Sequence, residues 1–524
     1  MQYAYEFISQ RAEFCKIFPR IDKGGIIRSG VISGRDENSA IPMYVNIIKK
    51  LDKKYFFIFF IVLLILSVFT RIFQPGLGEP RYLVFDERYY VPQALALVNP
   101  NLGHFPEDSD SELIKFGWRV ATALPEELRD VDFYRYFIEA IPHISEEQRT
   151  MFASHGRVTS AETFLFESLG TFDHPPTGKW LIASGSVFFD AGNQTGWRLA
   201  SAIAGVLLIV STALLAKFIF SSNIVACLAG FFVLIDGQGV VMSRIGMLDI
   251  FLSLFLVLSI LSVIAAYRFN EHKRFLNYRL PLLLLCAIFL GTAVGVKWQA
   301  GLWALFIAAY VFYKEFGNGK AHRWLRAALT PIIMGLVAFV VYIVPWFFTW
   351  VGQNGTFFEK FSAIIKEHIF MWQILARAVV TIDQPPGTVV FPLSWIVQDP
   401  GTFIYSDGMR TMAIHGNPVI WTLGIISIFA AIILLVIKRQ STLFVPAAMF
   451  LIGFIPWFFM FRRDAFIFYG IQVLPWLAII LSFLLVFVAK YFKKNHIGLI
   501  ISSFAIVIIT LASIIMMPQW IFAG

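Results

Sequence analysis

Long runs of apolar residues alternate with short polar stretches along most of the chain, from residue 55 to residue 522. A helix of about 20 apolar residues spans the hydrocarbon core of a bilayer. Most of the runs approach or exceed this length, so the pattern predicts an all-α polytopic membrane protein with about eleven transmembrane helices. The predicted spans are 55–73, 197–220, 222–238, 248–269, 280–298, 300–316, 324–350, 419–439, 442–461, 466–492 and 496–522.

The polar stretches between the runs divide the chain further. Residues 1–54 are polar and mixed in charge, and we expect a cytoplasmic N-terminal tail there. No secretory signal with a cleavage site precedes the first run, which should therefore remain as an anchor. Residues 55–524 form the predicted transmembrane domain, with external loops at about 74–196 and 351–418. The first loop contains apolar pieces such as 180–189, for which we predict interfacial helices.

The distribution of positive charge orients the predicted helices. With the N-terminus in the cytoplasm, every strongly basic short loop falls on the inner side, as the positive-inside rule requires. These loops carry Lys217, Arg268, Lys273, Arg274, Arg279, Lys314, Lys320, Arg323, Arg326, Lys438, Arg439, Lys490, Lys493 and Lys494. The net charge of +9 therefore suits lipid head groups rather than nucleic acid. We predict a multi-pass protein of the cell membrane.

Composition supports the membrane assignment. The chain has 524 residues, of which 58% are hydrophobic and only 15% charged, and its mean hydropathy is +0.70. Soluble domains carry about 25% charged residues. Three cysteines do not suggest a disulfide framework, and Cys227 and Cys286 lie inside apolar runs, as small core residues do.

Several cations break the charge bias on the predicted outer face. They are Arg198, Arg244, Lys297, Arg462 and Arg463. Charged groups in a membrane domain are costly and normally face a cavity or a partner. Any one of them can instead extend its charged end to the interface. Because separate segments bring cations to one face, we predict a phosphate site there.

Carboxylates occur near these cations. Asp86 and Glu87 form an adjacent pair just after the first span, Asp173 precedes His174, and Asp249 follows Arg244 by five positions. An isolated pair of this kind more often lies in a solvated loop and has no catalytic role. This pair, however, lies among aromatic residues on the cationic face. His174 stands beside two prolines and lacks the spacing of metal ligands. We therefore predict no metal site, although a divalent metal stays open.

Six short segments resemble the protein O-mannosyltransferase family. They are FDERYY, FDHPPTGKW, WRLASAIAG, SRIGMLDIF, VKWQAGLW and GNPVIW, within a stretch from about residue 84 to residue 476. Eukaryotic members carry a large strand-rich insert, for which this chain has no room, so it is more similar to the bacterial members. The resemblance implies the GT-C membrane glycosyltransferase fold. It also implies transfer of mannose from a polyprenyl-phosphate-mannose donor to Ser or Thr of secreted or membrane proteins, outside the cytoplasm.

The resemblance also implies roles for matched residues. Asp86 and Glu87 match the acidic pair that faces the acceptor, and Arg198 matches an arginine of the second-helix motif. A sugar phosphate has a good leaving group, so the reaction needs cations for the phosphate and a base for the hydroxyl. We expect Asp86 to be the base and Glu87 to position the acceptor. The substrate-binding candidates are Arg198, Arg244, Asp249, Lys297, Asp173, His174, Arg462 and Arg463.

Two alternatives stay open at this point. Another polyprenyl-phosphate-sugar transferase of the same fold would act on a lipid or a glycan. A transporter or lipid flippase would carry charges near the middle of the bilayer, whereas these charges collect at one face. The expected partners are the lipid-linked donor, membrane lipids and secreted proteins, with the translocation machinery as a candidate that presents the acceptors. No cofactor is expected with certainty, and no nucleic acid.

Overall fold

The computed structural model describes residues that all belong to the unit Leu51–Gly524. The described residues are 56–73, 77, 83–98, 172–189, 193–269, 278–317, 322–349, 355–377, 391–399, 401–406, 411–460, 465–492 and 496–520. The predicted tail, residues 1–54, lies outside them, and so does most of the predicted first external loop. Arg462 and Arg463 also lie outside the described residues.

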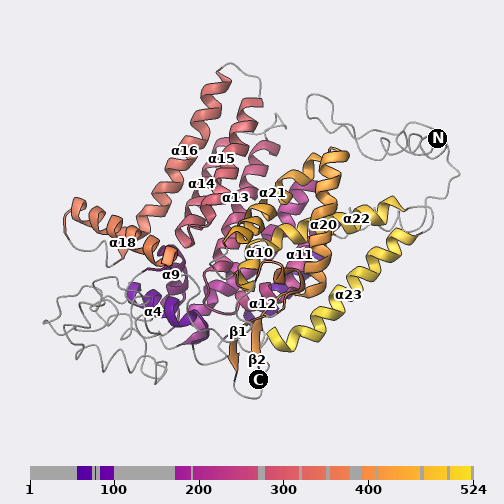
Figure 1. Cartoon of the computed structure of the whole chain (residues 1–524), viewed down its shortest axis with the longest axis horizontal. Helices are drawn as coiled ribbons and strands as arrows, with labels where there is room; N and C mark the ends of the chain where they lie inside the picture. The colour runs from indigo at the N-terminus through magenta and orange to yellow at the C-terminus, as the bar shows by residue number, and fades with distance from the viewer. Residues whose placement is uncertain are drawn as a thin grey trace. The chain divides into compact units, whose positions relative to one another are not determined.

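Each predicted span contains an α-helix (Figure 1). In chain order these are α3 (Phe56–Val68), α10 (Gln194–Phe220), α11 (Asn223–Ile235), α13 (Asp249–Phe269), α14 (Arg279–Val296), α15 (Ala300–Gly317), α16 (Arg323–Ile343), α20 (Pro418–Ile437), α21 (Phe444–Phe454), α22 (Leu474–Tyr491) and α23 (Ile497–Trp520). Short helical turns extend some of them, namely η2 (Phe69–Phe73), η6 (Val344–Phe348), η7 (Ser441–Leu443), η8 (Ile455–Phe459) and η9 (Ile467–Gln472).

The fold is that of a multi-pass membrane protein, but the count of eleven spans is not confirmed. Within the described residues, nine helices are long and apolar enough to cross a membrane. Helix α11 has 13 residues, or about 20 Å of helix, against a hydrocarbon core of about 30 Å. Helix α15 is not among the nine, and Lys314 and Glu315 lie in its last turns.

The helices pack around a continuous buried core. Helix α13 contacts α10 and α14, α14 contacts α16, and α22 contacts α11, α20 and α23. A small residue allows one of these approaches to be close. A Cβ atom on Gly291 of α14 would lie 2.4 Å from the carbonyl oxygen of Ala338 in α16. Small residues of this kind let membrane helices approach one another without a side chain between them.

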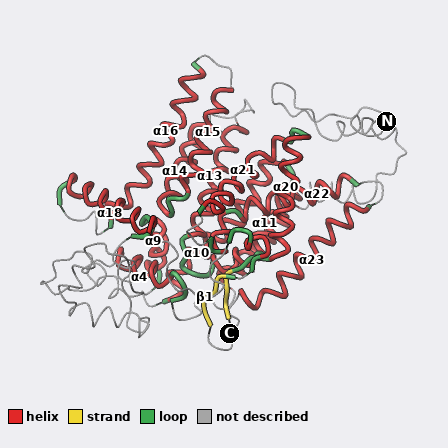
Figure 2. Tube along the Cα trace, viewed as in Figure 1, coloured by secondary structure: helices red, strands yellow, loops and turns green. Residues whose placement is uncertain are grey.

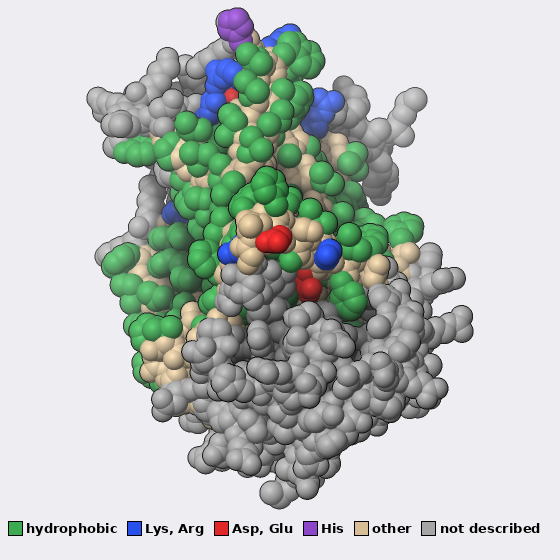
Figure 3. Space-filling view, turned by 90° about the vertical axis from the view of Figure 1, so that its left-hand side faces the viewer, with side chains coloured by type: hydrophobic (Ala, Val, Ile, Leu, Met, Phe, Trp, Pro, Cys, Tyr) green, Lys and Arg blue, Asp and Glu red, His purple; other side chains and the backbone are tan. Residues whose placement is uncertain are grey.

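The outer surface of the helices is apolar. Hydrophobic side chains cover most of the described part of the face in Figure 3, with few charged groups among them. On α23, Phe504 is 64% exposed and Ile515 is 74% exposed. A surface of this kind would be a liability in water, but it is the surface that a lipid-embedded helix needs.

Shorter elements lie between the spans (Figure 2). They are α4 (Glu87–Val98), α9 (Thr177–Ala183), η5 (Ser184–Val187), α12 (Gly237–Met242), α18 (Phe357–Arg377), α19 (Ser394–Val397), β1 (Thr402–Ser406) and β2 (Thr411–Ile414). Strands β1 and β2 pair antiparallel, with Thr402 opposite Ile414. Helix α9 contacts α4, α10 and α14, and these contacts bring the polar segments of the candidate site together.

Candidate active site

Glu87 and Arg198 form a buried ion pair at the centre of the candidate site. Both side chains are fully buried. The guanidinium donates to both carboxylate oxygens, from Nε to Oε1 and from Nη2 to Oε2, each at 2.7 Å. Glu87 also accepts the backbone N–H groups of Gly246 at 2.7 Å and Val84 at 3.0 Å. One carboxylate thus joins α4, α10 and the segment that precedes α13.

Glu87 and Arg198 therefore have a structural role, which the sequence does not reveal. Each carboxylate oxygen of Glu87 already accepts two hydrogen bonds. Arg198 also donates from Nη1 to the carbonyl oxygen of Leu77 at 3.3 Å. Glu87 therefore holds the start of α4 in place, and this also fixes the backbone of the preceding residue, Asp86.

Asp86 lies beside the pair but has a different environment. Phe85 precedes it with φ at +47°, a left-handed conformation that is uncommon for an aromatic residue. Such strained positions cluster at functional sites. The Asp86 side chain is partly exposed and accepts a long hydrogen bond of 3.5 Å from the Tyr90 hydroxyl. Among the described residues, no cation forms an ion pair with Asp86.

The electrostatic surroundings of Asp86 favour its protonated form more than water does. Burial raises the pKa of Asp86 to about 7, and the charges of Asp173 and Asp249 act in the same direction. Lys297 and the Tyr90 hydroxyl oppose this shift. A carboxylate with a pKa near neutrality is a stronger base than a solvated one. The two adjacent acids thus differ. Both carboxylate oxygens of Glu87 accept two hydrogen bonds each, whereas Asp86 accepts one long hydrogen bond from Tyr90.

Lys297 and Asp249 form a second pair at the same site. Lys297 follows α14, and its Nζ lies 2.8 Å from Oδ2 of Asp249 at the start of α13. Gln472 donates to the other oxygen of Asp249 at 3.2 Å. The ammonium group also lies 5.4 Å from the ring centroid of Tyr469. Aromatic faces attract cations at this distance, so several contacts hold Lys297 in place.

Asp173 and His174 lie in a segment that contains a lysine which sequence reasoning missed. Lys179 is fully buried, and its Nζ lies 2.9 Å from Oδ1 of Asp173 and 3.0 Å from the His174 carbonyl oxygen. Burial acts to raise the pKa of Asp173, but Lys179 and His174 outweigh it and lower that pKa. Lys179 stands in the quoted segment FDHPPTGKW, one helical turn after Pro176. That spacing is the signal that would have found it.

Arg244 is the remaining predicted cation within the described residues, and it lies close enough to Arg198 for the two positive charges to interact. Arg244 donates from Nη1 to the carbonyl oxygen of Thr70, in η2, at 3.0 Å. Next to Thr70, the buried Arg71 donates to the Leu234 carbonyl oxygen at the end of α11, at 2.8 Å. Arg462 and Arg463 fall outside the described residues. Of the predicted phosphate ligands, Lys297 carries a charge that lowers the pKa of Asp86.

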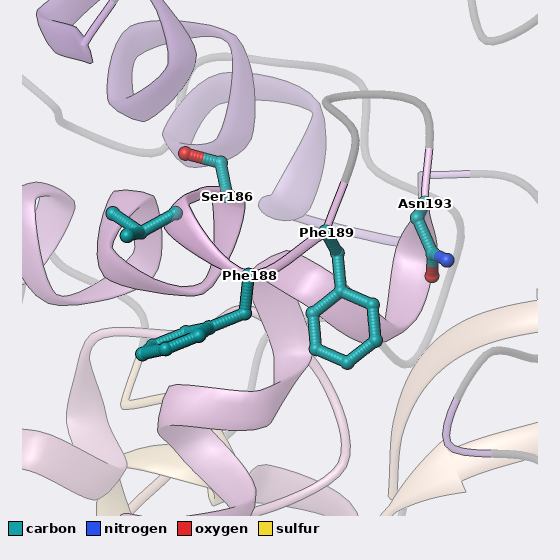
Figure 4. Close-up of a pocket in the computed structure, with 5 residues that line it drawn as sticks. Ser186, Phe188, Phe189 and Asn193 are labelled. Carbon is teal, nitrogen blue, oxygen red and sulfur yellow. The ribbon is translucent and has the colours of Figure 1, made fainter.

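Neither a pocket near α9 nor the described acidic, histidine and cysteine side chains form a phosphate or metal site. A pocket of about 310 Å³ lies at the end of η5, lined by Ser186, Val187, Phe188, Phe189 and Asn193 (Figure 4). None of these five side chains is ionisable, so this pocket does not suit a phosphate. Within the described residues, no group of three or more His, Cys, Asp or Glu side chains has the geometry to hold a metal ion.

The chain is similar in sequence to known mannosyltransferases. The family model described as dolichyl-phosphate-mannose-protein mannosyltransferase matches residues 154–353. The chain is similar to the polyprenol-phosphate-mannose–protein mannosyltransferase of Mycolicibacterium smegmatis (strain MKD8), with 26% identity over 60% of this chain and 71% of the relative. The protein of that name from Corynebacterium glutamicum is also 26% identical, over 60% of this chain and 70% of the relative.

Solved structures support the fold. The chain is similar to the Saccharomyces cerevisiae protein O-mannosyltransferase Pmt1–Pmt2 complex bound to its sugar donor, with a TM-score of 0.64 and 12% identity over 90% of this chain and 91% of that chain. An Archaeoglobus fulgidus oligosaccharyltransferase gives a TM-score of 0.50 and 16% identity over 89% of this chain and 53% of that chain. The resemblance of the sequence motifs is thus confirmed, and the chain is a membrane glycosyltransferase of GT-C fold related to the protein O-mannosyltransferases.

Proposed function

We propose that the chain transfers mannose from polyprenyl-phosphate-mannose to Ser or Thr hydroxyls of proteins on the external face of the membrane. The observation that carries the proposal is the contrast between the two adjacent acids. Glu87 is saturated with hydrogen bonds, whereas Asp86 is partly exposed, forms no ion pair among the described residues and has a pKa of about 7. The fold and the mannosyltransferase relatives supply the reaction class.

The proposed step is a direct displacement at the sugar. The acceptor oxygen forms a bond to C1 of mannose while the bond from C1 to the phosphate oxygen breaks. Asp86 takes the hydroxyl proton, and polyprenyl phosphate departs with the bonding electron pair. No acid is needed for this leaving group, since phosphate is a weak base. The base is needed because a serine or threonine hydroxyl has a high pKa.

We assign the other candidate residues to the two substrates. Lys297, Arg198, Arg244, Arg462 and Arg463 are proposed to offset the negative charge of the donor phosphate. The contacts of Lys297 with Asp249 and Tyr469 support a fixed position for its charge. Asp173 and His174 are proposed to contact the sugar or the acceptor. Their side chains are 25% and 15% exposed, which leaves part of each available to a substrate.

The pH dependence of turnover follows from the proposed role of Asp86. The base form is unprotonated, so kcat/KM should rise with pH through about 7 and level off above it. Lys297 lowers the pKa of Asp86, so Lys297→Gln should move this rise to higher pH. The exposed Lys438 offers a control, because Lys438→Gln should leave the profile unchanged. Profiles of the parent and Lys297→Gln that coincide would show that Lys297 does not act on the base.

We propose that residues 1–54 lie in the cytoplasm of a bacterial-type cell and that the loops 74–196 and 351–418 lie outside. In a Cys15→Ser background, an impermeant thiol reagent should label Ser109→Cys in intact cells. It should label Asn277→Cys only after permeabilisation. Labelling of Asn277→Cys in intact cells would reverse the proposed orientation and place the site in the cytoplasm.

A transfer assay in membranes tests the proposed function. Membranes with and without the chain are incubated with labelled polyprenyl-phosphate-mannose and a peptide rich in Ser and Thr, or with its Ala-substituted counterpart. Label should enter the Ser/Thr peptide only in membranes that contain the chain. Label found in a lipid or glycan instead would favour another transferase of this fold. Donor that crosses the bilayer unchanged would favour a flippase. We also propose that the translocation machinery presents the acceptors, because the site is proposed to lie on the external face.

A further inference from the structure

Helix α18 lies in the predicted second external loop and is strongly amphipathic. It begins with a capping box, in which Thr356 N–H donates to the Glu359 carboxylate at 2.6 Å and Glu359 N–H donates to the Thr356 hydroxyl at 3.4 Å. Its outer face carries exposed apolar side chains, including Phe358 and Trp372. The rings of Phe357 and Phe347 stack at 5.8 Å. The start of α18 therefore packs against η6, the turn that follows α16, while its outer face stays apolar and exposed, as in an interfacial helix.

The inner face of α18 packs on the candidate site. A small hydrophobic cluster, separate from the main core, consists of Leu97, Phe172, Trp346, Ile364 and Met371. Ile364 and Met371 belong to α18, Leu97 to α4, and Phe172 begins the segment that contains Asp173 and Lys179. The cluster joins α18 to α4 and to the segment that begins at Phe172, and both carry residues of the proposed reaction.

Glu367 is the polar contact between α18 and the Phe172–Lys179 segment. Its Oε1 accepts the backbone N–H of Phe172 at 2.9 Å. Burial raises the pKa of Glu367 to about 7, while this hydrogen bond and the charge of Lys179 oppose the shift. Glu367 thus holds the residue directly before Asp173.

The next residue, His368, attaches α18 to the ends of two spans. Its Nδ1 donates to the Ile364 carbonyl oxygen at 2.6 Å, so Nε2 is the acceptor and receives the Tyr342 hydroxyl at 2.5 Å. The Tyr342 oxygen in turn accepts the indole N–H of Trp298 at 2.8 Å. Trp298 directly follows Lys297. His368 therefore anchors α18 to α16 and to the residue next to the proposed phosphate ligand.

We propose that Glu367 is a positioning residue for the transfer reaction: it holds the Phe172–Lys179 segment in place from α18, which His368 anchors to the span ends. The inference rests on the proposed function, since the segment positions Asp173, one of the charges around Asp86. A shift of this segment would change the distance between the base and the acceptor hydroxyl. A misplacement of about 1 Å in an active site costs up to about 100-fold in rate.

Two conservative variants separate the role of the hydrogen bond from that of the charge. Glu367→Gln keeps an oxygen that can accept the Phe172 N–H but loses the charge. Glu367→Asp keeps the charge but is one methylene too short to reach. We expect Glu367→Gln to retain most of the parental kcat. Glu367→Asp should lower kcat by about 10- to 100-fold, with the donor KM and the thermal unfolding midpoint near parental values. Lys366→Gln, on the exposed side of the same helix, is the matched control.

The measurement uses the full-length protein in proteoliposomes with labelled donor and a Ser/Thr peptide. A Glu367→Asp variant with parental kcat would overturn the inference. A Glu367→Gln variant as slow as Glu367→Asp would also overturn it, because the hydrogen bond would then not be the cause. A loss of kcat that follows a loss of folded protein would assign Glu367 a structural role only. Failure of the parent itself to transfer mannose would reject the proposed function, a result distinct from all three.

Discussion

Asp86→Asn is expected to lower kcat by about 10²–10⁴-fold, the range over which a positioned general base commonly acts. The amide keeps the size of the carboxylate and can still accept from the Tyr90 hydroxyl, which lies 3.5 Å from Asp86. It cannot take the proton of the acceptor hydroxyl. The donor KM should stay near the parental value, because the change does not remove a cation. Steady-state turnover of a Ser/Thr peptide by purified protein measures both constants.

A second carboxylate in the predicted external loops provides the control. Asp399 is exposed, and Asp399→Asn should leave turnover unchanged. Both variants should match the parent in expression and thermal unfolding. Near-parental kcat in Asp86→Asn would remove Asp86 as the base and leave the proposed mechanism without its proton acceptor.

Glu87→Ala is expected to destabilise the fold by about 3–5 kcal/mol, the usual cost of breaking a buried ion pair. Arg198 would keep its charge in a fully buried position, with its two hydrogen bonds to Glu87 lost. The N–H groups of Gly246 and Val84 would lose their acceptor as well. Thermal unfolding of purified Glu87→Ala and Asp86→Asn measures this difference. Glu87→Ala should lose much of the parental stability, and Asp86→Asn should lose little.

The double variant Glu87→Met with Arg198→Met separates stability from activity. Replacing a buried ion pair by apolar residues of similar size is often neutral or stabilising. The double variant should therefore recover much of the stability that Glu87→Ala loses. It should remain inactive, because Asp86 would lose the fixed point beside it and the donor phosphate would lose the proposed charge of Arg198. Full turnover in a Glu87→Ala protein of parental stability would contradict the structural role of the pair.

The sequence alone predicted where the helices lie, but it did not predict where each helix ends. A membrane allows only structures that satisfy their own backbone hydrogen bonds, so an apolar run predicts a helix reliably. It does not show where the helix stops. The run at 222–238 is interrupted at Asp236, whose side chain caps α12 by accepting the Gln238 N–H. The run is thus divided between α11 and α12, and the span count changes with it.

The candidate site was predicted only in part, because its chemistry depends on long-range pairing. Glu87 and Arg198 are 111 positions apart in the sequence, and no local pattern shows that they bind each other. The adjacent acids Asp86 and Glu87 are therefore indistinguishable until the fold separates their surroundings. Glu367 and His368 were missed for the same reason. Their partners, Phe172 and Tyr342, lie in other segments, and a single histidine carries no spacing signal.

The most direct test of the account identifies the product of purified protein. Parent and Asp86→Asn protein, reconstituted in proteoliposomes, receive polyprenyl-phosphate-mannose and a peptide with a single serine, and tandem mass spectrometry locates any added sugar. We expect one mannose on the serine oxygen with the parent, and a greatly reduced amount of the same product with Asp86→Asn. An unmodified peptide with folded parent, or equal product from both proteins, would contradict it.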